Sequence, residues 1–146
     1  MTKGEASHLI LLRAQEQLMR SAVQLEKSFK KSNKISLSNC SEGDLEVLDA
    51  FTSRFARTSD ILVRKVLRLL FATQEVEAGT TIVDLLNFAE KHSLIESAKA
   101  FLDMRELRNE IAHEYSNRDF EKLIRDVLEF TPKLLDAAKK ASVIVL

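Results

Sequence analysis

Residues that turn or break the chain are scarce in this sequence, and this scarcity limits the folds it can adopt. The 146 residues include only three glycines and one proline. A β-rich fold needs many tight turns, and glycine and proline form a large share of them. Long helices are therefore expected, and a chain of this length with 45% hydrophobic residues can bury one core. We predict a single all-α domain over residues 1–146.

Apolar residues recur at helical spacing along most of the chain. In the first helix, expected at about residues 5–31, the apolar stripe comprises Leu11, Leu18, Ala22, Leu25 and Phe29. The second helix, expected at about residues 44–77, has a core face formed by Leu48, Phe51, Phe55, Leu62, Val66 and Leu69. These stripes predict that the helices pack side by side around a common core.

Capping residues and breakers divide the rest of the chain into three more helices. Ser41 with Asp44 resembles a capping box for the second helix, and Gly79 ends that helix. Further helices are expected from Thr80 or Thr81 to about residue 91, and from about residue 94 into residues 108–115. Ser116 and Asp119 repeat the capping pattern and predict a last helix from about residue 117. Pro132 kinks or splits the last one, and the apolar tail 142–146 packs on a neighbouring helix. The predicted architecture is an up-and-down bundle of four to five helices.

Charge, cysteine and histidine content exclude several classes of function. Basic and acidic residues balance at 22 each, so RNA could bind only at a local patch, and near-zero net charge favours self-association. The single Cys40 excludes an internal disulfide and indicates a reducing compartment. His8, His92 and His113 are too scattered to suggest a metal site, and no apolar run approaches membrane-spanning length. We expect a cytoplasmic protein without metal, cofactor or membrane contact.

One face of the second helix is basic. At about 100° per residue, five cations fall within an arc of roughly 100°: Arg54, Arg57, Arg64, Lys65 and Arg68. A solvated cationic face is one interpretation. The other is a phosphate track or a docking surface for an acidic partner, with Arg54 and Arg57 as candidate contacts to RNA or a partner.

The segment RNEIAHEY, residues 108–115, gathers the rarest polar side chains of the chain. Asn109 and His113 are four residues apart and share a helix face, so the amide could fix the orientation of the imidazole. In RNA cleavage the ribose 2′-hydroxyl attacks the adjacent phosphate. Histidine can move the protons, and arginine can stabilise the added charge on phosphate. The alternative is structural: Arg108 pairs with a neighbouring carboxylate such as Glu110 or Glu114, and His113 caps the helix.

The pattern R-N-x-x-x-H-x-Y late in a small helical domain resembles the HEPN superfamily, and within it the HepT-like toxins. This resemblance implies a homodimer whose motif segments meet to form a metal-independent endoribonuclease site. Arg108 and His113 would be catalytic, and Asn109 would orient them. It also implies a partner, a minimal nucleotidyltransferase (MNT) antitoxin that silences the toxin by attaching AMP to Tyr115. A negatively charged AMP beside a phosphate site would repel RNA.

Two other functions stay open from the sequence. Relatives of this family resemble non-catalytic subunits that bind a substrate or nucleotide for a separate nucleotidyltransferase. A third possibility is a purely structural dimerisation bundle in which residues 108–115 form a polar seam.

Overall fold

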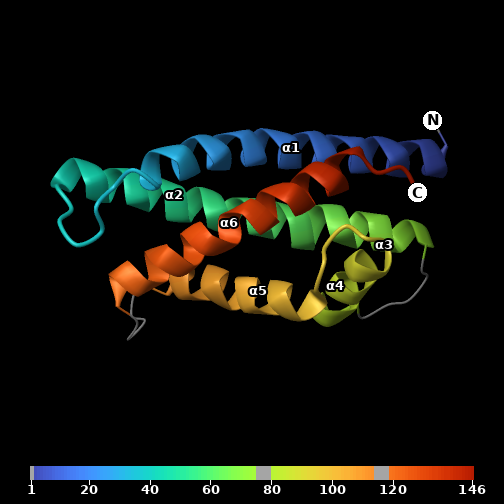
Figure 1. The fold of residues 1–146 in the computed structure, drawn as a ribbon. Coiled ribbons are helices and arrows are strands. Elements are labelled where there is room, and N and C mark those ends of the chain that lie inside the picture. The colour runs from blue at the N-terminus through green and yellow to red at the C-terminus, as the bar shows by residue number, and fades with distance from the viewer. Residues whose placement is uncertain (1, 75–79, 114–118) are drawn as a thin grey trace.

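The computed structural model describes residues 2–74, 80–113 and 119–146, and every element of regular secondary structure in these residues is a helix. Three of the helical elements join end to end, so the described chain forms five helical rods (Figure 1). The elements are α1 (Lys3–Ser32), α2 (Glu42–Asp60), the π-helix η1 (Ile61–Leu67), α3 (Arg68–Gln74), α4 (Ile82–Lys91), α5 (Ala98–Ala112) and α6 (Phe120–Val143). The all-α prediction is confirmed.

The long α2–η1–α3 rod lies at the centre of the bundle and runs antiparallel to α1 (Figure 1). It also contacts α5 and α6, while α6 packs along α1 as well and α4 packs on η1 and α5. Both chain termini lie at one end of the bundle, and the C-terminal end of α5 points towards the other end. Residues 108–113 are therefore remote from both termini.

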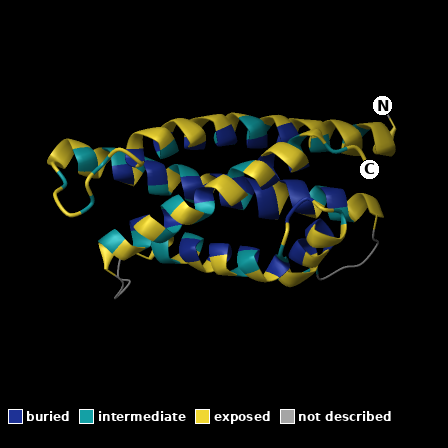
Figure 2. Ribbon diagram, viewed as in Figure 1, coloured by how far each residue is buried: buried dark blue, intermediate teal, exposed yellow. Residues whose placement is uncertain are grey.

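Buried side chains form one continuous core between these rods (Figure 2). Leu18, Ala22 and Leu25 of the predicted stripe on α1 are buried, whereas Leu11 and Phe29 are half-buried at its margins. On the central rod, the predicted face is buried except for the half-buried Leu69. No helix in the described ranges is both long and apolar enough to cross a membrane.

Capping boxes fix the starts of three helices. Thr2 and Glu5 begin α1, Ser41 and Asp44 begin α2, and Thr81 with Asp84 begins α4. In each box the hydroxyl accepts from a backbone N–H and the carboxylate accepts from the cap residue's own N–H. The predictions at Ser41 and Thr81 are confirmed.

Helix α5 begins later than predicted. Helix α5 begins at Ala98 and not at about residue 94, because the Ser97 hydroxyl accepts from the N–H of Ala100 and caps it there. Leu94 and Ile95 are buried, which explains why they resemble a helix face, but they belong to the connecting segment. Helix α6 begins at Phe120, where Asp119 accepts from the N–H of Glu121. The predicted cap at Ser116, the start at residue 117 and the helix end at Gly79 lie outside the described residues.

Helix α6 continues through Pro132 and is not split. The predicted packing of the tail 142–146 holds only for Ile144, which is half-buried against the core, whereas Val143, Val145 and Leu146 are exposed. The Gln15 side chain donates to the carbonyls of Ala141 and Ile144 at 3.0 and 3.1 Å, which ties the end of α6 to α1.

Candidate functional site

The described part of the RNEIAHEY motif lies on the last turn of α5. Arg108 is half-buried, whereas Asn109 and His113 are exposed. The helix ends at Ala112, and His113 follows it in an extended conformation as the C-cap residue. The hydrogen bond that links Asn109 with His113 is a main-chain bond, from the N–H of His113 to the carbonyl of Asn109 at 3.0 Å. Tyr115, the predicted modification site, lies outside the described residues.

The Arg108 guanidinium is held by a carboxylate that is distant in the sequence. Its Nε and Nη2 donate to Oδ1 and Oδ2 of Asp60 at 2.8 and 2.7 Å, a bidentate pair that spans 48 residues. This geometry is the strongest form of an arginine–carboxylate contact. The carboxylate that binds Arg108 in this way is therefore Asp60 on α2. Of the two neighbouring acids considered from sequence, Glu114 lies outside the described residues.

A second arginine shares the same carboxylate. Arg105, one turn earlier on α5, donates from Nη1 to Asp60 Oδ1 at 2.8 Å and to the Ser59 hydroxyl at 2.7 Å. Arg105 is only 5% exposed. Its Nε has no hydrogen-bond partner in the part of the chain that the structure describes. The formal charges of Arg105, Arg108 and Asp60 sum to plus one, so the cluster stays cationic.

Electrostatics keep all three groups of the cluster ionised. Burial raises the pKa of Asp60, but hydrogen bonds from Arg108 and Arg105 lower it by more, so it lies below the ordinary 3.8. Hydrogen bonding to Asp60 raises the pKa of Arg108. Burial lowers the pKa of Arg105, and Asp60 opposes this shift only in part. We refer to Ser59, Asp60, Arg105 and Arg108 as the Asp60 cluster.

The cluster sits where the central rod changes its geometry. Asp60 is the last residue of α2, and the next seven residues form the π-helix η1. Such wide turns are rare and occur often at functional sites. Sequence reasoning missed Asp60, although a signal exists: it is the only acidic residue between Ala50 and Gln74, a stretch that carries five basic ones. An isolated acid in a basic stretch is a reason to search for a distant basic partner.

The two other predicted contact residues, Arg54 and Arg57, line a groove between α1 and α2. Arg54 is half-buried, and its Nη1 donates to the Ser28 hydroxyl at 2.7 Å and to the Gln24 carbonyl at 3.4 Å. Arg57 is exposed. The structure does not join these residues to Arg108 directly, but Arg57 and Asp60 occupy successive turns of α2.

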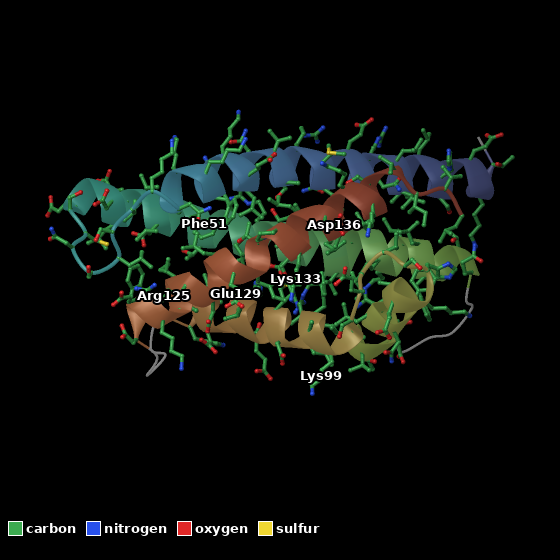
Figure 3. The ribbon with its side chains drawn as sticks, in the orientation of Figure 1. Phe51, Lys99, Arg125, Glu129, Lys133 and Asp136 are labelled. Atoms are coloured by element: carbon green, nitrogen blue, oxygen red, sulfur yellow. The ribbon has the colours of Figure 1, made fainter. Side chains whose placement is uncertain are left out.

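The groove on the other side of α5, between α5 and α6, is acidic. It has a volume of about 370 Å³ and is lined by Asp103, Glu106, Glu110, Asp126 and Glu129, with Lys133 as the only cation among its lining residues in the described chain. Glu129 and Lys133 lie on the exposed side of α6 (Figure 3). A surface with this charge repels phosphate, so an RNA strand is not expected to lie along it.

The remaining candidate residues do not gather with the motif. His8 is exposed on α1, and the His92 ring packs against Phe88 in a tilted arrangement with ring centroids 4.5 Å apart. The Cys40 thiol donates weakly to the Ser36 carbonyl at 3.4 Å, in the loop before α2. Within the described residues, no group of three or more His, Cys, Asp or Glu side chains is arranged to hold a metal ion.

Comparisons with protein-family models, with curated proteins and with solved structures gave no match for this chain. The candidate function therefore rests on the motif and on the geometry around it.

Proposed function

We propose that this protein is a metal-independent endoribonuclease of the HepT-like type that acts as a homodimer. The observation that carries the proposal is the state of Arg108. Its guanidinium is fixed by a bidentate carboxylate within a cluster that keeps a net positive charge. His113 follows five residues later, just past the end of α5, and is exposed. A preorganised cation and an accessible imidazole, brought to the same phosphate in a dimer, would suit the stabilisation of a phosphate transition state.

The reaction needs no co-reactant. The 2′-oxygen of the ribose forms a bond to phosphorus while its proton passes to a base, and the bond from phosphorus to the 5′-oxygen breaks as that oxygen accepts a proton. The products are a 2′,3′-cyclic phosphate and a free 5′-hydroxyl. His113 of one or both subunits would transfer the protons, and Arg108 would stabilise the charge on the non-bridging oxygens. Asn109 would orient them.

Arg108 can perform this role while bound to Asp60. The bidentate pair uses two of the five N–H donors of a guanidinium, so three donors lie outside this pair. Asp60 acts here as a positioning residue, which fixes the plane of the guanidinium and lowers the entropy cost of ordering it. Adenylylation of Tyr115 by an MNT antitoxin remains part of the proposal.

Cleavage of RNA in the presence of EDTA tests the proposal. His113→Ala and Arg108→Gln should each reduce cleavage by at least 100-fold, in the range expected for one acid–base or electrostatic group. His8→Ala removes an exposed histidine near the start of α1, at the end of the bundle away from the motif. It is the matched control and should leave the rate of cleavage unchanged. Circular dichroism verifies that each variant is folded. Equal cleavage by His113→Ala and His8→Ala would refute the assignment.

A second function, a non-catalytic subunit that binds a substrate or nucleotide for a nucleotidyltransferase, is favoured by one observation. The charge of Arg108 is already partly neutralised by Asp60. This function predicts a stable complex with the nucleotidyltransferase, no cleavage by any preparation and no toxicity on expression. Toxicity that disappears in the His113→Ala variant would exclude it.

A further inference from the structure

The groove between α1 and α2 is a cationic concave surface. It has a volume of about 330 Å³ and is open to solvent along the two helices. Three arginines line it: Arg20 from α1, and Arg54 and Arg57 from α2. The other lining residues are Gln17, Ser21, Gln24 and Ile61.

No described residue that lines the groove is acidic. Arg54 is fixed by hydrogen bonds to α1, and at one end Lys65 donates to the Gln17 amide at 2.9 Å, which adds a fourth positive charge to its edge. Glu16 approaches Arg20 only to 4.0 Å, and both side chains are about 70% exposed, so Glu16 neutralises little of the positive charge of Arg20. In a chain with 22 basic and 22 acidic residues, this surface is a local excess of positive charge.

We infer that this groove binds the sugar–phosphate backbone of single-stranded RNA and leads it to Arg108. The inference deepens the proposed function and rests on it. The connection is Arg57, which lies three residues, or about one helical turn, before Asp60, the residue that holds Arg108. The acidic groove between α5 and α6 closes the opposite side of α5 to a strand.

The composition of the groove favours a backbone over other anionic partners. Among the described lining residues none is aromatic, so bases have no side chain on which to stack, and recognition is independent of sequence. An acidic protein partner would need an apolar centre, and Ile61 is the one aliphatic side chain that the groove offers. The amides of Gln17 and Gln24 and the Ser21 hydroxyl suit phosphate and ribose oxygens.

Fluorescence anisotropy with a labelled 12-nucleotide single-stranded RNA tests the inference, using the His113→Ala protein so that the probe stays intact. The test variant adds Arg20→Gln and Arg57→Gln. The control adds Lys99→Gln and Lys139→Gln, which removes the same charge from exposed positions on α5 and α6. Each phosphate contact to a single strand releases about 0.7 counterions, so the loss of two contacts should reduce the slope of log K against log salt concentration by about 1.4. This corresponds to roughly 25-fold weaker binding at 0.1 M salt, taken relative to the effect at 1 M salt. The control should stay within about threefold, and oligo-U and oligo-A should behave alike.

Equal binding by the two double variants would overturn the inference, and so would displacement of the RNA by poly-glutamate at equal charge concentration, which would identify an acidic protein as the partner. Cleavage separates this result from the fate of the proposed function. In the protein that retains His113, Arg20→Gln with Arg57→Gln should raise KM for cleavage of the 12-mer by a larger factor than KM for cleavage of a dinucleoside phosphate, which is too short to reach the groove. RNA cleavage together with equal binding by the two double variants would refute only the groove, whereas groove-dependent RNA binding without any cleavage would refute only the nuclease.

Discussion

Replacement of Asp60 by asparagine tests the central contact of the structure. The substitution keeps the shape of the side chain but removes the charge that three N–H donors share at 2.7–2.8 Å. If the asparagine oxygen takes the place of Oδ1, two charge-assisted bonds become weaker ones and the bond to Oδ2 is lost, because an amide NH₂ then faces Arg108. Arg105, with 6% of its side chain exposed, keeps a charge without a counter-ion.

The magnitude follows from these changes. Each weakened bond costs about 1 kcal/mol and the lost bond about 2 kcal/mol. The Asp60 side chain is 29% exposed, so water offsets part of this loss. We expect the free energy of unfolding to fall by about 3 kcal/mol, near the lower limit for removing one partner of a buried ion pair. With an m-value of about 2 kcal/mol per molar urea, the unfolding midpoint falls by roughly 1.5 M.

Urea unfolding followed by circular dichroism measures the change, with Asp136→Asn as the matched control. Asp136 pairs with Lys140 at 3.0 Å on the exposed surface of α6, where an ion pair contributes under about 1 kcal/mol (Figure 3). Adding Arg105→Met to Asp60→Asn should recover part of the loss, because the double variant no longer buries an unpaired charge. Midpoints of Asp60→Asn and Asp136→Asn that agree within about 0.3 M would refute the reasoning.

Three further predictions follow from other contacts. The pKa of Asp60 is lowered on folding, so its contribution to the free energy of unfolding is present above its unfolded pKa of about 3.8 and is lost as pH falls through the folded value. The stability difference between the natural protein and Asp60→Asn should therefore be constant from about pH 5 to 7 and shrink below about pH 4. Gln15→Ala removes two bonds to the carbonyls of Ala141 and Ile144 and should cost about 2 kcal/mol, with faster amide exchange confined to the end of α6; uniform exchange along α6 would contradict this. Ser41→Ala removes the cap of α2 and should lower stability by about 1 kcal/mol in urea unfolding, whereas Ser41→Asp should restore most of it.

Most of the helical architecture could be predicted because its signals are local. The boxes at Ser41 and Thr81 operate within four residues, and the apolar stripe of the central rod repeats at a regular spacing. Helix α5 shows the limit of such reasoning. Leu94 and Ile95 are apolar because they are buried in a connecting segment, and spacing alone does not distinguish that burial from a helix face.

The candidate site was predicted only in part because its main contact is distant in the sequence. The motif identified Arg108 and His113, but neighbouring residues suggested Glu110 or Glu114 as the carboxylate, since those were the acids within reach along one helix. The observed partner becomes adjacent only when α5 packs on α2. The π-helix after Asp60 has the same origin: its sequence ILVRKVL suits an ordinary helix, so its wide turn reflects packing and not local preference.

The placement of both termini at one end of the bundle lets the distance between termini distinguish two ways in which a dimer could form. Helix α1 alone, with 30 residues at 1.5 Å each, is about 45 Å long. If two copies met through the ends at which α5 stops, all four chain termini would emerge at the outer tips of an elongated particle close to 90 Å in length (Figure 1). Probes attached to the two N-termini would then be too far apart for efficient energy transfer, whereas a lateral association would bring at least some of them within range.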